Sequence, residues 1–314
     1  MINLLTPEFV FTVIRVTTPI LFAAMAAIIC TKSGVINIAL ESIMLTAALT
    51  GVLASGFSQS LLVGVIGGVL GGMLIAGMLA YFSLYLKADI ILVGIALNLM
   101  AVGGTVFVMF ALTGDRGATN SIRSLQFPTF NIPIIQDIPV LGQILSGHNV
   151  LTYLAILSVF GVWFFLGKTT FGLRMRSVGE NPDAATSVGI DVRKVKFIAL
   201  LISGALGGFG GMYMSMAYLS VFSTNMVAGR GFISLAAASM GQANPFGTLL
   251  AATFFGLMES ISYQLQALGI PAQIVDMVPY ISVIIGLVMY AQYQQNLQNK
   301  KKLMRQLNEE THEA

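Results

Sequence analysis

Long apolar stretches dominate this chain and decide the environment in which it can fold. Hydrophobic residues make up 56% of the 314 positions and charged residues only 9%, whereas roughly 25% of an ordinary soluble domain is charged. An apolar run of about 18 residues or more can cross the hydrocarbon core of a membrane as a helix. The sequence therefore predicts an all-α, polytopic integral membrane bundle, formed as a single transmembrane domain by residues 1–314.

The apolar runs predict about nine crossings. Their approximate bounds are 9–31, 34–55, 60–86, 90–112, 149–167, 197–220, 229–243, 247–266 and 274–291. The seventh run is short, and Asn244, Pro245 and Gly247 form a turn signal directly after it, so this segment either spans or re-enters. The first run has neither a positive region before it nor a small-residue cleavage site, and we expect a retained span rather than a signal peptide.

The placement of Lys and Arg predicts the orientation of the bundle. Cations gather in two segments, 168–196 and 292–314, and such residues accumulate in short cytoplasmic loops. Both segments, including the C-terminus, are therefore expected on the cytoplasmic side of the cell membrane. Alternation places segment 113–148 outside. The net charge of +3 reflects the same bias, and the absence of a basic-aromatic patch argues against nucleic acid.

Segment 113–148 is long for a connection in a compact bundle. It contains Pro128, Pro133 and Pro139 and has no helical period. Such length favours a docking or gating role, with an unstructured spacer as the alternative.

Small residues recur within the predicted spans. Gly64, Gly68 and Gly72 are four residues apart, as are Gly204 and Gly208, and this spacing lets helix backbones approach closely in lipid. Residues 34–42 also resemble residues 231–239, and the predicted topology runs the two segments in opposite directions. This similarity predicts an inverted repeat, a common basis of transporter folds.

Features of catalysis and metal binding are hard to find in this sequence. Cys30 is the only cysteine, and His148 and His312 lie too far apart in loops to indicate a metal site. Residues 161–169 imitate a phosphate-binding loop but have one residue too many before Gly-Lys-Thr, and they close an apolar span rather than open a helix. We therefore expect no enzyme activity, no metal and no nucleotide bound by this chain.

The charged segment 168–196 contains its own helix signal. Asn181 is a good N-cap, Pro182 suits the first helical position, Asp183 favours the positive end of the helix dipole, and Gly189 suits the left-handed residue beyond the end. The spacing predicts about two helical turns over residues 182–188. A helix this short is marginal in water, so we expect it to pack on this protein, on a partner or, through its cationic flanks, on membrane lipid.

At these residues the chain resembles a known family. The pattern Gly-x-Asn-Pro-x-Ala-Ala-x-x-x-Gly-Ile at residues 179–190, together with Ser-Gly-Val-Ile-Asn-Ile-Ala-Leu-Glu at 33–41, is similar to permease subunits of ATP-binding-cassette importers for branched-chain amino acids, simple sugars and nucleosides. The resemblance covers nearly the whole chain and is greatest to the nucleoside branch. Ala39 and Ser42 depart from the glycines expected there, which weakens the substrate assignment more than the family assignment.

The resemblance implies a division of labour among several subunits. This chain would form half of a translocation path, beside a second permease subunit, and ATP would be bound by a cytoplasmic ATP-binding subunit. An extracytoplasmic solute-binding lipoprotein would deliver the solute. Residues 180–189 would be the coupling helix that the ATPase grips, through Glu180, Asn181, Pro182, Asp183, Ala184, Ala185 and Gly189.

Polar side chains within the apolar runs are the candidates for contact with solute. A charge at the centre of a membrane helix costs roughly 2.5–3.5 kcal/mol on insertion scales, so such residues normally face a cavity or a partner. Asn37 and Glu41 are one helical turn apart in the second predicted span, and Asn98 is mid-span in the fourth. We predict that these three line the path for a polar, uncharged solute. The alternative is structural: Glu41 would bond a neighbouring helix and Asn37 would cap a break after Gly34.

Two other functions fit parts of the sequence. A permease for a simple sugar or a branched-chain amino acid shares every architectural feature described above. An ion-coupled secondary transporter would instead use Glu41, Glu259 or Asp276 as proton carriers. Dependence on ATP or on a proton gradient distinguishes the second alternative from an ATP-driven importer.

Overall fold

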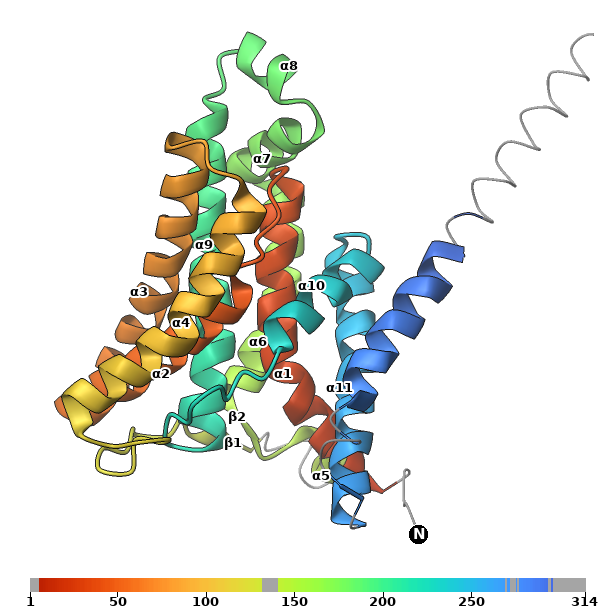
Figure 1. Ribbon diagram of the computed structural model, residues 1–314. Helices are drawn as coiled ribbons and strands as arrows, with labels where there is room; N and C mark the ends of the chain where they lie inside the picture. The colour runs from red at the N-terminus through yellow and green to blue at the C-terminus, as the bar shows by residue number, and fades with distance from the viewer. Residues whose placement is uncertain are drawn as a thin grey trace, which may run out of the picture.

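The computed structural model describes residues 6–131, 141–268, 270–271, 275, 277–292 and 295. The predicted tail 292–314, His312 and Asp276 therefore lie wholly or mostly outside the described residues. Within them the fold is helical apart from one antiparallel pair of two-residue strands, β1 and β2 (Figure 1). The bounds are α1 Pro7–Lys32, α2 Leu40–Ser58, α3 Leu61–Ala80, η1 Tyr81–Tyr85, α4 Ile90–Thr113, β1 Thr129–Phe130, α5 Leu141–Leu145, β2 His148–Asn149, α6 Val150–Lys168, α7 Thr170–Glu180, α8 Pro182–Ser187, α9 Val192–Met212, η2 Tyr213–Tyr218, α10 Arg230–Met240 and α11 Pro245–Ala267, followed by a helix over Met277–Gln292.

Six helices of the described part are long and apolar enough to cross a membrane. They are α1, α2, α3 with η1, α4, α6 and α9 with η2. α11 has the length to cross, about 34 Å, but polar residues including Glu259 lie in its second half. α10 has 11 residues and spans about 16 Å, roughly half of a hydrocarbon core about 30 Å thick. The doubtful seventh segment is thus a short helix that does not cross alone.

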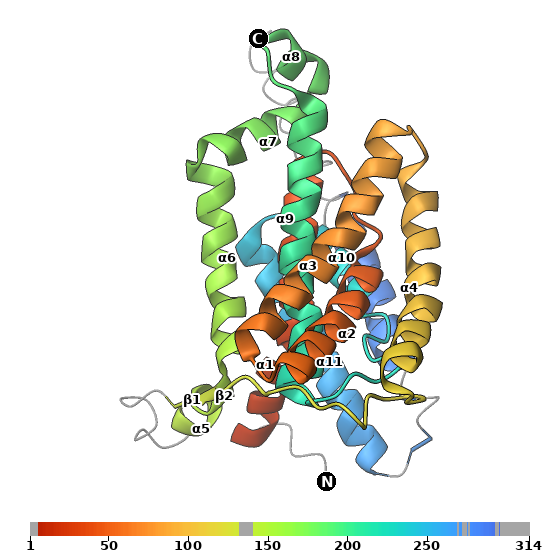
Figure 2. The ribbon, with the colours of Figure 1, turned by 90° about the vertical axis from the view of Figure 1, so that its left-hand side faces the viewer.

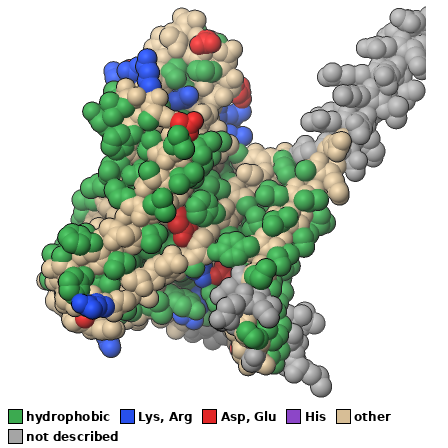
Figure 3. All heavy atoms as spheres, viewed as in Figure 1, with side chains coloured by type: hydrophobic (Ala, Val, Ile, Leu, Met, Phe, Trp, Pro, Cys, Tyr) green, Lys and Arg blue, Asp and Glu red, His purple; other side chains and the backbone are tan. Residues whose placement is uncertain are grey.

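The core forms around α1, the most buried of the six candidate spans. From Ile20 to Cys30 every side chain of this helix is at most 2% exposed, because α6, α9, α10 and α11 surround it (Figure 2). On the flanks of the bundle the opposite holds: α4 exposes large apolar side chains such as Leu92, Leu99 and Phe107. Figure 3 shows this apolar surface between two ends where Lys and Arg gather, as expected for a membrane-spanning bundle.

Glycines bring α3 and α9 into backbone contact. A Cβ atom on Gly72 would lie 2.4 Å from the carbonyl oxygen of Gly204, and one on Gly208 would lie 3.2 Å from that of Gly68. The predicted close approach through glycines spaced by four residues is therefore confirmed for these two helices.

The described part of segment 113–148 is ordered against the connection that leads to α10. The backbone N–H of Thr119 donates to the oxygen of Phe222, and those of Ser124 and Phe127 donate to the oxygens of Ser220 and Met216. Residues 119–127 are therefore hydrogen-bonded to η2 and to the irregular connection after it. For this stretch the unstructured-spacer alternative is wrong.

The second predicted span does not begin as a helix. Residues 34–39 are non-helical and α2 starts only at Leu40, because Gly34 takes a left-handed conformation (φ +73°) that ends the preceding turn. The expectation that Asn37 and Glu41 are one turn apart on a helix is consequently wrong. We call residues 34–39 the break.

α2 and α10 run in opposite directions from neighbouring starts. α2 runs from its start toward the 122–125 segment, which its last turns contact at Ser55 and Gly56. α10 runs toward the end of the molecule that carries α8 (Figures 1 and 2). The two similar sequence segments differ in local structure, however, since 34–39 is the break and 231–239 is entirely helical.

Candidate functional site

Asn37 stabilises the break through two side-chain hydrogen bonds. Its side-chain oxygen accepts a hydrogen bond from the backbone N–H of Ala39 at 3.2 Å, and its Nδ2 donates to Ser203 Oγ on α9 at 2.9 Å. The residue is 1% exposed. Asn37 thus satisfies backbone that has left the helix and ties the break to α9.

Asn98 holds the break from the opposite side. It lies on α4, where its side-chain oxygen accepts from the N–H of Ser42 at 3.0 Å and its Nδ2 donates to the carbonyl of Ile38 at 3.0 Å. Interruption of a helix leaves such backbone groups without intrahelical partners. One amide side chain supplies both a donor and an acceptor to them.

Glu41 joins α2 to α10. Its two carboxylate oxygens accept from the backbone N–H groups of Gly229 and Gly231, each at 2.8 Å, and the side chain is buried. These N–H groups belong to the start of α10, where free donors and the positive end of the helix dipole favour a negative charge. A Cβ atom on Gly231 would lie 2.5 Å from the nitrogen of Glu41, so only glycine permits this approach.

The three residues predicted to line the path are therefore assembled around one feature, the break and the two helix starts beside it. Their hydrogen bonds tie the break to α9 and α4 and join α2 to α10. This matches the structural alternative for Asn37, which stabilises the break after Gly34, and for Glu41, which bonds the neighbouring helix α10. Contact of any of the three with solute stays a prediction.

The charged segment 168–196 forms an arm of two helices, α7 and α8, that projects from one end of the bundle (Figure 1). α7 was missed by the sequence reasoning. Thr169 caps it, since its Oγ1 accepts from the N–H of Gly172 at 3.1 Å, and the helix buries Met175 and Val178 while exposing its arginines. The Thr169 cap and this amphipathic period were the available signals.

α8 has the predicted caps. Asn181 Oδ1 accepts from the N–H of Ala184 at 3.0 Å, Pro182 is the first residue, and Gly189 has φ +81°. The expected helix over 182–188 is confirmed to within one residue. Glu180, however, is the last residue of α7, because the extended backbone of Asn181 separates the two helices.

α8 presents most of its surface to the exterior. Ala185 is buried at 1%, whereas Pro182, Asp183 and Ala184 are exposed and Val188 is 74% exposed. Beyond α8, Asp191 caps α9, and the backbone N–H of Lys194 holds the pKa of that carboxyl below its usual range. A short, well-capped helix with an open face is suited to docking against another protein.

A contact between two glycines links the arm to the break. A Cβ atom on Gly179, in the last turn of α7, would lie 2.3 Å from the carbonyl oxygen of Lys32 and 3.0 Å from the nitrogen of Gly34. Gly34 starts the break that leads to Glu41. The backbone of the arm is therefore in direct contact with the turn from which the break starts.

Replacing Gly179 by valine tests this linkage. The added side chain would force α7 away from the Lys32–Gly34 turn. We expect solute uptake to fall about tenfold, the order of a lost coupling between two sites, while the arm still binds its partner. Uptake and partner binding should be measured on the same preparation. Gly167→Ala is the matched control, since its Cβ would meet nothing within 4 Å; equal uptake in both variants would contradict the linkage.

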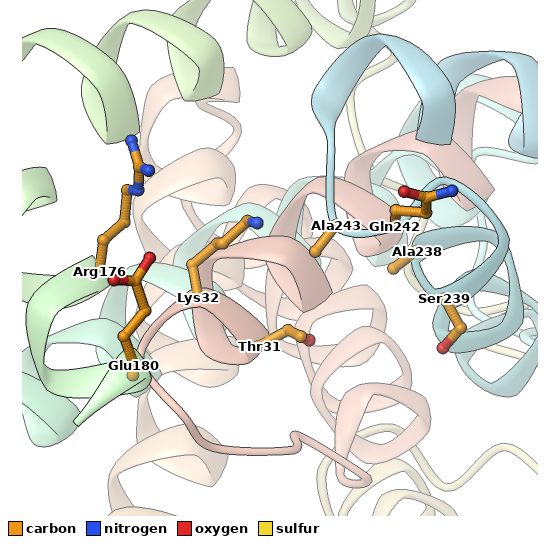
Figure 4. Close-up of a pocket in the computed structure, with 9 residues that line it drawn as sticks. Thr31, Lys32, Arg176, Glu180, Ala238, Ser239, Gln242 and Ala243 are labelled. Atoms are coloured by element: carbon orange, nitrogen blue, oxygen red, sulfur yellow. The ribbon is translucent and has the colours of Figure 1, made fainter. Parts of the chain in front are cut away.

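A cavity of about 380 Å³ lies beside this contact, at the end of the bundle that carries α8. In Figure 4, Lys32 at the end of α1 lies between Arg176 and Glu180 of α7 on one side and Ser239 and Gln242 at the end of α10 on the other. The cavity thus separates the arm from the helix whose start Glu41 holds. Movement of the arm toward α10 would close it.

The ion pair at the start of α10 was not predicted from the sequence. Arg230 pairs with Glu259 of α11, and their side chains are only 12% and 8% exposed. Tyr263 OH accepts from Arg230 at 2.7 Å and donates to Glu259 at 3.0 Å. Glu259 stands out in the sequence as a charge in an apolar run, but neither its role between helices nor its pairing with Arg230 has a local signal.

Known proteins resemble this chain over most of its length. Residues 9–292 match the family model described as "Branched-chain amino acid transport system / permease component". The nucleoside ABC transporter permease protein NupC of Lactococcus lactis is 35% identical, over 87% of this chain and 89% of its own. The guanosine ABC transporter permease protein NupQ of Bacillus subtilis is 38% identical, over 86% and 87%.

Two further similarities are at lower sequence identity. TsgC13 of Haloferax volcanii, whose name refers to a glucose ABC transporter permease, is 30% identical over 82% of this chain and 77% of its own. Among solved structures, a chain described as part of a metal-chelate type ABC transporter in an inward-facing conformation matches with a TM-score of 0.50 at 14% identity, over 88% of this chain and 85% of that one. That match concerns the fold alone.

Proposed function

This chain belongs to the family of permease components of the branched-chain amino acid transport system, and from that premise we propose that it carries nucleosides inward as half of an ABC importer's translocation path. The observation that carries the substrate class is similarity at 35–38% identity, over about 86% of the chain, to permeases named for nucleosides and guanosine. As a transport component, the chain is not an enzyme, and a separate ATPase binds the ATP.

The proposed topology is a single permease domain over residues 1–314. The end that carries α8, with segments 168–196 and 292–314, faces the cytoplasm, and 113–148 lies outside. Nine hydrophobic segments give this arrangement when the short helix α10 is counted as one crossing. In this proposal α10 and the segment that contains the break are the two discontinuous crossings. α2 and α10, which run in opposite directions from starts joined by Glu41, are the proposed centre of an inverted repeat.

Three partners follow from this role. The exposed face of α8 would be seated in a cytoplasmic ATP-binding subunit, and the apolar flank of α4 would meet a second permease subunit or lipid. The ordered segment 119–127 would receive a solute-binding lipoprotein, and its hydrogen bonds to residues 216–222 would carry that contact to the connection before α10. Asn37, Glu41 and Asn98 remain our candidates for residues beside the path.

Energy would enter through the arm. ATP-driven closure of the ATPases would displace α8 and α7, and the glycine contact with residues 32–34 would pass the displacement to the break. Because Glu41 ties the break to α10, the two helix starts would move together. The cavity beside Lys32 would then alternate between a state that is open to the cytoplasm and a state that is closed to it.

The function is tested by uptake in proteoliposomes that contain this chain, its ATPase and its receptor. We expect labelled nucleosides to accumulate only when ATP is supplied on the cytoplasmic side, with inhibition by vanadate. Accumulation driven by a proton gradient without ATP would contradict the importer. ATP-driven uptake of a simple sugar or a branched-chain amino acid, with none of nucleosides, would contradict only the substrate.

A further inference from the structure

A second cavity, of about 300 Å³, lies between the start of α10, the second half of α11 and the last described helix, Met277–Gln292. Its size is at the lower end of the roughly 300–1,000 Å³ typical of small-molecule sites. Arg230 and Ile233 of α10, Glu259, Ser262 and Tyr263 of α11, and Tyr280 of the last helix line it. Like the cavity of Figure 4 it is lined by charged side chains, but here Arg230 and Glu259 are 12% and 8% exposed and the rings of Tyr263 and Tyr280 lie beside them.

The polar side chains of this cavity are fixed to one another. Arg230 donates to the carbonyl oxygens of Met226 at 3.2 Å and Val227 at 3.1 Å as well as to Glu259 and Tyr263. Tyr280 OH donates to the oxygen of Ala228 at 2.9 Å. Buried charges are tolerated when such bonds satisfy them, and the result is a rigid polar wall rather than loose side chains.

One acceptor in that wall is left over. Glu259 Oε1 receives bonds from Arg230 and Tyr263, but Oε2 is buried and accepts no hydrogen bond in the described part of the chain. A buried polar atom without a partner is costly and calls for an explanation. Within a membrane bundle, a buried ionisable residue beside a cavity is a candidate for a functional site.

We propose that this cavity binds the sugar of a transported ribonucleoside, with Glu259 Oε2 as the acceptor for its vicinal hydroxyl groups. The inference rests on the proposed function. Arg230 and Glu259 neutralise each other's charge, which suits an uncharged solute. The two hydroxyl groups of the sugar can donate hydrogen bonds to Glu259 Oε2, which receives none from the described residues of the protein. The rings of Tyr263 and Tyr280 offer flat apolar surface for the base.

The position of the cavity connects binding with movement. Arg230 lies between Gly229 and Gly231, whose N–H groups Glu41 binds. Solute in the cavity therefore contacts the first turn of the helix that the arm is able to displace through the break. Binding and the proposed conformational change meet at this turn.

Selectivity in uptake tests the proposal. Glu259→Gln keeps the size of the side chain but removes its charge and one acceptor oxygen. We expect uptake of a ribonucleoside to fall roughly 10- to 100-fold, the effect of a hydrogen bond to a charged group, while uptake of its 2′,3′-dideoxy analogue changes little. The solute receptor is the same in the unmodified complex and in the Glu259→Gln complex. Its own preference for one analogue therefore cancels when the ratio of ribonucleoside uptake to dideoxynucleoside uptake is compared between the two complexes. Ser260→Ala, on the same helix but bonded only to the Gly256 oxygen, should leave the ratio unchanged.

A second measurement decides the matter if Glu259→Gln fails to fold. The only native cysteine, Cys30, is buried, so Gln266→Cys places a single accessible thiol at the lining of the cavity. We expect a ribonucleoside, but not its dideoxy analogue, to slow alkylation of this thiol in the full complex. Ala267→Cys, exposed and outside the lining, should be alkylated at the same rate with or without nucleoside.

The outcomes separate this inference from the proposed function. Absence of ATP-driven nucleoside uptake in the unmodified complex would contradict the function itself. Uptake that falls equally for both analogues in Glu259→Gln would show a structural role only, and unprotected Gln266→Cys would show that solute does not enter the cavity. Either of these results overturns the inference and leaves the function intact.

Discussion

Replacement of Ala184 by arginine is expected to abolish ATP-driven uptake while the protein still inserts and folds. Ala184 lies on the exposed face of α8, so a long charged side chain there disturbs nothing within the bundle. In a docked complex the same side chain would be forced between α8 and the ATPase, where an unpaired buried charge costs several kcal/mol. The measurements are uptake, co-purification of the ATPase and thermal unfolding of the permease alone.

Ala184→Ser is the control for this variant, because it keeps a small side chain at the same position. Gly189→Pro should behave like the arginine variant, since φ +81° at Gly189 is outside the range of proline. Uptake near the unmodified level in both Ala184→Arg and Gly189→Pro would show that α8 does not couple the subunits.

Removal of the Glu41 carboxylate should produce the largest loss of stability of any single substitution considered. In Glu41→Ala the N–H groups of Gly229 and Gly231 lose their acceptors inside the bundle. At about 1–3 kcal/mol for each unsatisfied buried group, the free energy of unfolding should fall by about 2–6 kcal/mol. Uptake should be lost as well, because α10 is no longer tied to α2.

Glu41→Gln provides the graded comparison. Its amide oxygen can accept one of the two bonds but lacks the charge that favours a helix start, so we expect about half the loss of stability. Ser58→Ala, at the exposed end of the same helix, should unfold like the unmodified protein. A Glu41→Ala protein with unchanged thermal stability in detergent would show that the carboxylate does not hold α10.

Local signals in the sequence were sufficient for most helices and for α8. Apolar runs gave α1, α3, α4, α6 and α9 nearly in full, and a run of capping residues from Asn181 to Gly189 gave α8. Such signals act within a few residues of the feature that they specify, so they can be interpreted without knowledge of the fold.

Only part of the break could be foreseen from the sequence. Gly34 is its local signal, and an interruption capped by Asn37 was the structural alternative, but two of the residues that hold residues 34–39 in place are distant, Ser203 on α9 and Asn98 on α4. The pairing of Glu41 with the start of α10 joins positions 188 or more residues apart. Choosing Asn37, Glu41 and Asn98 as unusual was possible from the sequence, but their partners were not.

The Arg230 and Glu259 pair illustrates a second limit. Each residue is conspicuous in an apolar segment, yet only the packing of α10 against α11 brings them together. α7 illustrates a third: its few buried residues and exposed arginines resembled a charged loop because the helix lies against the bundle on one side alone.

Capture of the ATPase by a thiol on α8 tests the central claim most directly. Ala184→Cys adds one exposed cysteine to a chain whose native Cys30 is buried. The thiol-reactive end of a short bifunctional reagent can therefore attach to this chain only at position 184, and its other end is left to react with a neighbouring subunit. We predict that the crosslink joins the permease to its ATPase and that the crosslinked complex no longer transports. If the reagent modifies the thiol but never captures the ATPase, energy does not enter through α8.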